Sequence, residues 1–361
     1  MIWTHLDEDL MRSRLTPPEG NVRLAIDTDA ANEIDDQFAL AWALCLPERL
    51  KLEAVTAAPF SFAHHLPELQ AAEKALAVGQ GVAETLVGGF QGWVQRLHRS
   101  GRRVKDLKLV GPAEGMELSH AEILRVFDKM RVPVAGRLHR GAERYLTDEV
   151  TPVASAAATA LIDLAKSGGG PLHVAALGCL TNVASAILMA PEIIGNLVVV
   201  WTSAYPSHAL QSNRPSLNLV QDVAAARVVL DCGVPHVYLP GYHIGAQLKI
   251  SRPEMEIFVK GCGVIGDYLW RLYTQNPLHE MFAIEDAGRR TWVIWDLINI
   301  AWLIDPDWVP SFLTRSPVLD ADLRWTHPLG RHAMREAHDV QRDEIFLHFY
   351  DTLSRHVGLP S

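Results

Sequence analysis

Residues 22–45 read VRLAIDTDAANEIDDQFALAWALC, and this stretch decides the fold that the sequence predicts. The apolar run Val22–Ile26 is typical of a buried strand, in which side chains two residues apart share a face, so Asp27 and Asp29 point the same way at its end. Asp35 and Asp36 then fall in the first turn of a helix, whose dipole favours negative charge there. The helix is predicted from apolar residues that recur with the spacing of a helix packed on a sheet: Ile34, Phe38, Ala41, Trp42 and Cys45.

Four aspartates therefore meet at one turn, and nothing nearby in the sequence neutralises them. Between Leu24 and Glu48 there are six carboxylates and no Lys, Arg or His. Two unit charges about 4 Å apart repel by roughly 4 kcal/mol at an effective dielectric constant near 20, so the cluster needs a counter-charge. A hard divalent cation with oxygen ligands is the simplest one. The alternative is that one pair only forms a turn and the other only caps the helix, but capping needs one acid and this turn has four.

The spacing of these acids resembles a known family signature. The letters DTD at 27–29, followed by DD at 35–36, resemble the Asp-x-Asp-x-x-x-Asp-Asp signature of the inosine-uridine-preferring nucleoside hydrolase family. The loop between the two acid pairs is two residues longer here, with Asn32 and Glu33 added. The resemblance implies a calcium-dependent enzyme that hydrolyses the N-glycosidic bond of ribonucleosides to free base and ribose.

A second motif points to the same family. Residues 177–184 read LGCLTNVA and resemble the family's Leu-Gly-Pro-Leu-Thr-Asn-Ile-Ala, with Cys179 in place of proline. In that family the backbone carbonyl of the threonine binds the metal, so the resemblance implies this role for Thr181. The alternative is that Thr181 and Asn182 form an ordinary helix cap.

One more acid lies far along the chain. Residues 292–303 read WVIWDLINIAWL, which is apolar nearly all round and predicts a buried helix that contains Asp296. A buried carboxylate without a partner costs several kcal/mol, and a metal could be that partner. The resemblance then implies a calcium shell made, with waters, by Asp29, Asp36, the carbonyl of Thr181 and Asp296, which Asp27 would orient from behind.

The resemblance also implies which residues contact the substrate. Ser216-Leu217-Asn218 lies where the family has Glu-Phe-Asn, so Asn218 would bind ribose hydroxyls together with Asp35, while Ser216 replaces an acid that also holds the sugar. Trp295 stands where the family usually has a histidine before its last aspartate. It resembles the purine-preferring branch, in which aromatic rings stack on the base; core packing is the alternative for this tryptophan.

The implied reaction builds positive charge on the sugar, so a negatively charged pocket stabilises the transition state more than the ground state. Asp29 would take a proton from the attacking water as general base. Three histidines are candidates for the acid that protonates the leaving base, with stacking on Trp295 as a further contribution: His65, His243 and His279.

Composition limits the classes of partner. The 33 Lys and Arg against 42 Asp and Glu give a net charge of −9 without a basic block, so nucleic-acid binding is not expected. The four cysteines follow no metal or redox spacing and indicate reduced thiols of a cytoplasmic protein. No stretch reaches 18 uninterrupted apolar residues, and the acidic N-terminus lacks the pattern of a signal peptide, so a membrane protein is not expected either.

The alternation of strand and helix patterns predicts an α/β fold with a doubly wound, mostly parallel sheet and helices on both faces, whose ligands bind beyond the carboxyl ends of the strands. We expect residues 1–20 to form an extended N-terminal arm. Residues 21–361 would form a single domain with a helical insertion near 253–290. Short strands are predicted over Glu84–Val87 and Met130–Ala135. By analogy with the family, a homo-oligomer is expected.

Two other classes of protein remain open at this point. One is a protein of the same fold that binds the metal and a ribosyl ligand but has lost turnover, which Ser216 and the missing histidine favour. The other is a phosphatase of the haloacid dehalogenase type, suggested by the two aspartates of DTD. That pattern requires Thr or Val two residues after its second aspartate, and Ala31 stands there.

Overall fold

The computed structural model describes residues 3, 6–79 and 87–358. Its centre is an eight-stranded sheet in the order β3-β2-β1-β4-β5-β6-β12-β9. All neighbouring strands are parallel except β12 and β9, so the predicted doubly wound, mostly parallel sheet is confirmed. In chain order the strands of this sheet are β1 Val22–Thr28, β2 Leu50–Ala57, β3 Leu138–Arg140, β4 Leu172–Ala176, β5 Leu197–Ser203, β6 His236–Pro240, β9 Ser311–Arg315 and β12 Ala333–Ala337.

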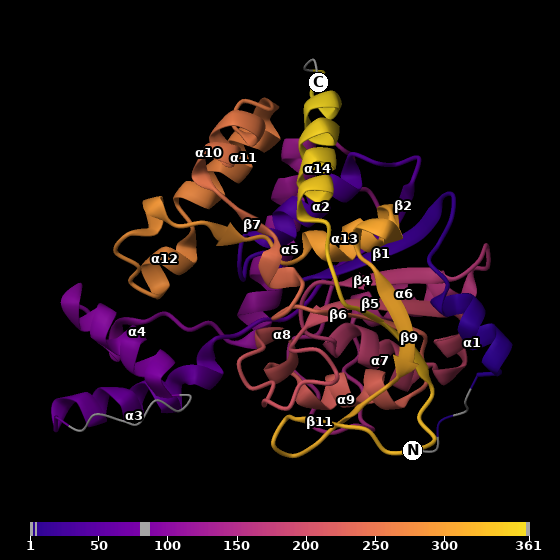
Figure 1. Cartoon of the computed structure of the whole chain (residues 1–361), viewed down its shortest axis with the longest axis horizontal. Coiled ribbons are helices and arrows are strands. Elements are labelled where there is room, and N and C mark those ends of the chain that lie inside the picture. Colours follow the sequence, from indigo (N-terminus) through magenta and orange to yellow (C-terminus); the bar gives the residue numbers. More distant parts are fainter. Residues whose placement is uncertain (1–2, 4–5, 80–86, 359–361) are drawn as a thin grey trace.

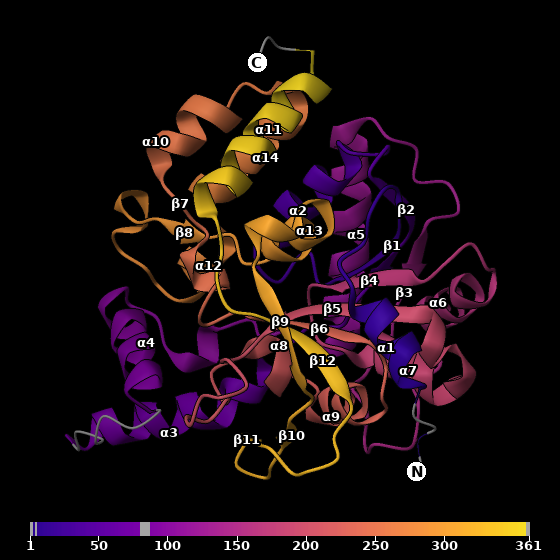
Figure 2. The same cartoon turned by 45° about the vertical axis from the view of Figure 1, so that its right-hand side comes forward.

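Helices cover both faces of the sheet (Figures 1 and 2). One large apolar core joins the sheet to a first group of helices: α2 Asp35–Leu44, α5 Pro112–Met130, α11 Gly263–Thr274, α13 Leu297–Ile304 and α14 Arg342–His356. A second core lies on the opposite face, under the other group: α6 Ala156–Lys166, α7 Thr181–Met189 and α9 Val223–Asp231. The sheet is therefore buried between two helical layers, which explains why its central strands read as continuous apolar runs.

Smaller elements surround this sandwich. The hairpin of α3 Leu66–Ala77 and α4 Val87–Arg99 projects from one side (Figures 1 and 2), and Trp93 Nε1 donates a 2.8 Å hydrogen bond to the carbonyl of Met281. Residues 252–289 are largely helical. The remaining elements are α8 Leu217–Val220, α10 Arg252–Glu254, α12 Pro277–Met281 and the strand pairs β7 Lys249–Ile250 with β8 Trp292–Val293 and β10 Val318–Leu319 with β11 Trp325–Thr326.

The first strand and helix form as the sequence predicts. In β1, Asp27 pairs in register with Ala176 of the neighbouring strand β4, and α2 begins at Asp35. Because the strands are parallel, the chain leaves β1 and β4 at the same edge of the sheet. The acidic turn after β1 and the motif that begins at Leu177 after β4 therefore lie side by side.

Residues 1–20 do not form the extended arm that we expected. Glu8–Leu15 form helix α1, whose first turn is capped by the carboxylate of Asp7. Met11 and Leu15 are buried, since residues four apart share one side of a helix, and Arg14 Nε donates to the carbonyl of Gly195 at 2.8 Å. This segment is thus packed against the body of the protein.

The prediction of a strand over Met130–Ala135 is wrong. Met130 is the last residue of α5, and its apolar side chain belongs to the buried face of that helix. Arg131 then adopts a left-handed conformation (φ 55°) that ends the helix, and the strand β3 begins only at Leu138. The strand predicted over Glu84–Val87 lies outside the described residues except for Val87, which begins α4.

The apolar segment 292–303 is not one helix. Trp292 and Val293 form β8, and α13 begins only at Leu297. Asp296 is consequently the residue that precedes the first turn of the helix rather than one inside it. The reason is that a short apolar strand and a buried helix give the same continuous apolar pattern in the sequence.

Candidate active site

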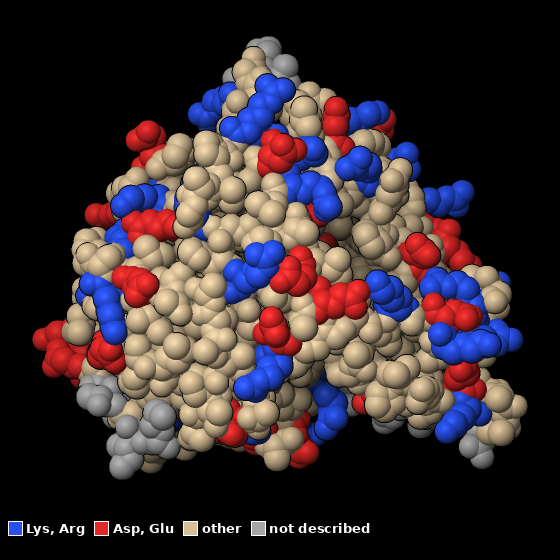
Figure 3. Space-filling model, turned by 180° about the vertical axis from the view of Figure 1, so that it is seen from behind, with Lys and Arg blue, Asp and Glu red and all other residues tan. Residues whose placement is uncertain are grey.

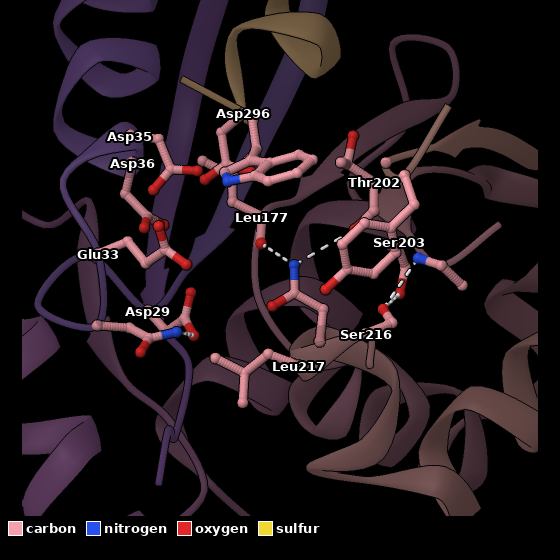
Figure 4. Close-up of a pocket in the computed structure, with 16 residues that line it drawn as sticks. Asp29, Glu33, Asp35, Asp36, Leu177, Thr202, Ser203, Ser216, Leu217 and Asp296 are labelled. Atoms are coloured by element: carbon pink, nitrogen blue, oxygen red, sulfur yellow. Dashed lines mark hydrogen bonds between the residues drawn. The ribbon is translucent and has the colours of Figure 1, made fainter. Parts of the chain in front are cut away.

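A pocket opens at the carboxyl ends of the central strands, where the turns after β1, β4, β5 and β6 meet (Figure 4). It encloses about 530 Å³, including its solvent-open mouth. Its acidic wall consists of Asp29, Glu33, Asp35, Asp36 and Asp296. The rest of the lining is neutral: Asn32, Leu177, Thr202, Ser203, Ala204, Ser216, Leu217, Asn218, Gly241, Tyr242 and Trp295. Among the residues that the structure describes, no Lys, Arg or His belongs to this lining, so these side chains leave the five acids without a counter-charge.

Three of the acids come together from two distant parts of the chain. Asp35, Asp36 and Asp296 each offer a carboxylate oxygen, and these oxygens lie within 4.8 Å of one another. All three side chains are buried, and the Thr28 hydroxyl donates to Oδ1 of Asp36. A buried set of closely spaced oxygens fits a hard divalent cation. This cluster could therefore hold a metal ion.

Burial and mutual repulsion shift the protonation of these acids. Burial raises the pKa of Asp36 to about 6, although the hydrogen bond from Thr28 opposes the shift. Burial and the charge of Asp36 raise the pKa of Glu33 to about 7. The pKa values of Asp29, Asp35 and Asp296 are raised well above the usual range by burial first and by neighbouring acids second. A bound cation would reverse these shifts, because it favours the ionised carboxylates.

Asp29 faces the pocket and is held on two sides. Its Oδ2 accepts a hydrogen bond from Nδ2 of Asn32 at 2.9 Å, and its backbone carbonyl accepts one from the backbone N–H of Asn32 at 2.7 Å. Its carboxyl group also lies against Gly178, where an added Cβ would be 2.8 Å from Asp29 Cγ. Only glycine leaves room for the carboxylate at this position.

Asp27 does not line the pocket. Its Oδ1 accepts hydrogen bonds from the Thr56 hydroxyl at 2.6 Å and from Nδ2 of Asn182 at 2.8 Å, so it joins β1 to β2 and to the start of α7 behind the site. Burial raises the pKa of Asp27 to about 6, and the same two hydrogen bonds lower it. Its contacts place it as a support for the turn that carries Asp29.

The structure does not bring Thr181 to the pocket. Thr181 is the first residue of α7, where a backbone carbonyl points along the helix, and its hydroxyl donates to Asp222 at 2.6 Å. The backbone carbonyl of Leu177 lies at the pocket instead, where it accepts a 2.6 Å hydrogen bond from Asn218 (Figure 4). The sequence did not predict this oxygen, because every residue has a backbone carbonyl and the residue type does not show where it points. Leu177 is nevertheless the first residue of the motif at 177–184.

The neutral wall holds the residues expected to meet a sugar. Nδ2 of Asn218 donates to the carbonyls of Leu177 and, at 3.3 Å, Thr202, which leaves its Oδ1 as an acceptor. Ser216 lines the pocket as well, but its hydroxyl is engaged by the Ser203 hydroxyl at 2.7 Å and by the backbone N–H of Ala204 at 2.9 Å. The serine therefore does not offer the charge that an acid would bring here.

An aromatic group forms the remaining side of the pocket. Trp295 lines it, and its ring meets that of Tyr242 edge to face, with centroids 5.6 Å apart. None of the three candidate histidines is among the lining residues. His65 packs among aromatic rings near α4, His243 is exposed, and His279 lies against Trp292 with ring centroids 5.0 Å apart.

Comparison with known proteins agrees with this geometry. The family model described as inosine-uridine preferring nucleoside hydrolase matches residues 24–345. The chain belongs to the inosine-uridine preferring nucleoside hydrolase family. The nucleoside hydrolase match thus covers both the acidic turn after β1 and Asp296.

Relatives of known structure share the nucleoside hydrolase fold. The chain is similar to a purine-preferring ribonucleoside hydrolase from Gardnerella vaginalis (TM-score 0.61, 16% identity, 93% of this chain and 99% of that one). It is also similar to an inosine-guanosine nucleoside hydrolase (TM-score 0.61, 17% identity, 92% and 98%). A third match is an inosine-uridine preferring nucleoside hydrolase from Bacillus anthracis (TM-score 0.57, 13% identity, 92% and 99%).

A curated relative matches over a shorter stretch. A probable uridine nucleosidase 2 of Arabidopsis thaliana is 24% identical over 164 residues, which is 44% of this chain and 51% of that protein. The match thus spans about half the length of the curated relative.

Within the described residues, no helix combines the length and apolar character that a bilayer span requires. Positive and negative side chains are interspersed over the face shown in Figure 3.

Proposed function

We propose that this protein hydrolyses the N-glycosidic bond of ribonucleosides in a calcium-dependent reaction. The observation that carries the proposal is the convergence of five acids on one pocket whose described lining includes no cationic side chain. Cleavage of an N-ribosidic bond builds positive charge on the sugar, and fixed negative charge in a buried pocket stabilises that charge. Membership of the nucleoside hydrolase family supports the same reaction.

The residues present fit a calcium ion. Asp36 and Asp296, whose carboxylate oxygens lie together with that of Asp35, would hold it with Asp29, which lines the same pocket. The carbonyl of Leu177 replaces Thr181 as the backbone oxygen in our proposal. Calcium accepts six to eight oxygen ligands in flexible arrangements, which suits acids that come from separate elements. When bound, such an ion would hold sugar hydroxyls and lower the pKa of a water.

The other steps of the proposed reaction would depend on individual side chains of the pocket. Asp29 would accept the proton of the attacking water, since its carboxylate faces the pocket and is held in place by Asn32. Asp35 and the free oxygen of Asn218 would accept hydrogen bonds from ribose hydroxyls. Asp27 would keep the turn in place through Thr56 and Asn182.

The base would lie against the aromatic wall. Trp295 offers a large ring at the pocket, and stacking on an extended π system favours a purine over a pyrimidine. A purine preference is therefore part of the proposal. Location in the cytoplasm and assembly into a homo-oligomer stay predictions from the sequence.

Two observations favour a second candidate, a metal- and ribosyl-ligand-binding protein without turnover. Among the described residues, no histidine lines the pocket and Ser216 stands where the family carries an acid. Incubating the protein with a panel of purine and pyrimidine ribonucleosides, with calcium or with EDTA, separates the two functions. Calcium-dependent release of free base and ribose that an Asp29→Ala variant lacks supports the hydrolase. Nucleoside binding without release supports the binding protein.

A further inference from the structure

The lining of the acidic pocket constrains which base can leave from it. An uncharged base that takes the electron pair of the broken carbon–nitrogen bond becomes an anion unless an acid protonates it. Among the described residues, no His, Lys or Arg lines the pocket, and its five acids would be ionised beside a bound cation. These side chains therefore oppose the negative charge that an uncharged base develops as it leaves.

A base that already carries a positive charge leaves differently. In an N7-alkylated purine or an N-substituted pyridinium, the electron pair of the broken bond cancels the positive charge of the ring. The base then departs as an uncharged molecule and needs no proton. The five acids also attract such a base before the reaction, because a calcium ion would offset only two of their charges.

Glu33 is the acid best placed to meet the base. It lines the pocket and is partly exposed, and its carboxylate points toward the centre of the pocket between Asp36 and Asp29 (Figure 4). It does not belong to the three acids whose oxygens lie together, and the proposed reaction gives it no role. Burial first and the charge of Glu33 second raise the pKa of the Tyr242 hydroxyl, so Glu33 acts electrostatically on the aromatic wall.

The aromatic wall offers a second surface that attracts cations. Trp295 and Tyr242 both line the pocket, and their rings meet at an angle of 75° with centroids 5.6 Å apart. The Tyr242 hydroxyl donates to the carbonyl of Pro215 at 2.6 Å, which fixes the tyrosine ring. The face of an aromatic ring attracts a cation, and that of tryptophan does so most strongly. A flat cationic ring therefore meets an aromatic face and a carboxylate in the same pocket.

We propose that the substrates are ribonucleosides whose base carries a fixed positive charge, which Glu33 and the rings of Trp295 and Tyr242 recognise. This inference rests on the proposed function and narrows its substrate class. The oxygen of a water forms the new bond to the anomeric carbon, and a proton of that water passes to Asp29 and then to solvent. The electron pair of the carbon–nitrogen bond moves onto the ring nitrogen. The products are ribose, an uncharged base and one proton.

The kinetic experiment compares kcat/KM for N7-methylguanosine with kcat/KM for guanosine in the presence of calcium. Cationic nucleosides are intrinsically more labile, but this difference cancels when the ratio of a variant is divided by that of wild type. Glu33→Gln should lower the ratio roughly 5- to 10-fold, because it removes one partly screened charge beside the base. Trp295→Leu should lower it about 3- to 10-fold. Glu192→Gln is the matched control, since Glu192 is an exposed acid paired with Lys166 outside the lining, and its ratio should equal that of wild type.

A binding measurement without turnover accompanies the kinetics. Calorimetry of the calcium-loaded protein compares N1-methylnicotinamide, a cation, with uncharged nicotinamide. The cation should bind at least about 10-fold more tightly to wild type, and Glu33→Gln should reduce this preference. Nicotinamide riboside joins the kinetic assay to distinguish the two kinds of base. Cleavage of both cationic nucleosides supports recognition of the charge itself, and cleavage of one alone supports the proposal for that ring.

The outcomes separate the substrate class from the reaction. A Glu33→Gln protein that keeps the wild-type kcat/KM ratio, or a wild type that binds the two nicotinamides equally, overturns the proposed substrate class, while release of guanine leaves the proposed function standing. An equal loss of activity on both guanosines in Glu33→Gln shows that Glu33 does not recognise the charge, and also overturns it. A wild-type protein that releases base from none of these nucleosides overturns the proposed function, and the substrate class with it.

Discussion

Replacing Asp36 with asparagine should stabilise the calcium-free protein, although it removes part of the negative charge of the candidate active site. Asp36 is 2% exposed, and burial raises its pKa from 3.8 to about 6. A carboxyl whose pKa is raised in the folded state does not change the free energy of unfolding below its unfolded pKa, where both states are protonated. As the pH rises from 3.8 to 6, the free energy of unfolding falls, and above pH 6 the loss is complete. The gap between the two pKa values corresponds to roughly 3 kcal/mol of lost stability at pH 7.5.

The amide removes this charge but keeps an oxygen for the Thr28 hydroxyl. The amide also turns one carboxylate oxygen into an N–H donor, which cannot accept the backbone hydrogen bonds that this carboxylate receives. This mismatch offsets about 1–2 kcal/mol of the gain, so the net stabilisation should be roughly 1–2 kcal/mol. At about 2 °C per kcal/mol, Asp36→Asn should raise Tm by roughly 2–4 °C in EDTA. Calcium at 100 times its Kd should add about 2.7 kcal/mol, or roughly 5 °C, to wild type and much less to the variant.

The assay is thermal unfolding at pH 7.5 in EDTA and in a calcium series. Asp128→Asn is a suitable control, because Asp128 is an exposed acid paired only with Lys129, and it should leave both curves unchanged. A lower Tm for Asp36→Asn in EDTA would refute the argument that the buried, ionised Asp36 lowers stability without a cation. A wild-type protein whose Tm ignores calcium would refute the metal site itself.

Three further changes test other parts of the structure. Gly178→Ala places a methyl group 2.8 Å from Asp29 Cγ, so base release should fall at least about 100-fold while the fold stays intact by circular dichroism. Trp295→Ala should lower kcat/KM for purine nucleosides by about 10-fold, and less for pyrimidine nucleosides in the same assay. His236 is buried with its pKa lowered to about 3, so the unfolded state binds its proton first as the pH falls below 6.5, and stability is lost between pH 6.5 and 3. His236→Phe should recover roughly 2 kcal/mol in urea unfolding at pH 5 and nothing at pH 8.

The sequence predicted best what is local. The strand that begins at Val22, the turn with its acids and the helix that begins at Asp35 are set by side-chain periodicity and by charge within one short stretch. Asp296 was predictable for a different reason, because a single acid in a long apolar segment needs a partner. Its place before α13 was not, since the apolar pattern continues unchanged through β8 and the helix.

The sequence pattern does not predict which way a backbone atom points or which side chains meet in space. The carbonyl of Leu177 reaches the pocket because β4 ends there, which is a property of the sheet and not of leucine. The histidines at 65, 243 and 279 were candidates by residue type alone. In the folded protein all three lie outside the lining of the acidic pocket. Helix α1 was missed because only Met11 and Leu15 of its eight residues are buried, too few to give a clear period.

Four departures from the family pattern lie together at the pocket although they are far apart in the chain, whereas Cys179 does not line it. Asn32, Glu33, Ser216 and Trp295 all line the pocket, whereas the acids of the signature are kept. The acids would act on the sugar, and the changed residues form the wall around them, so we expect a reaction at the same bond with a different group carried by the sugar. The substrate panel should therefore include nucleosides with modified bases, on which the aromatic wall and the added loop would act directly.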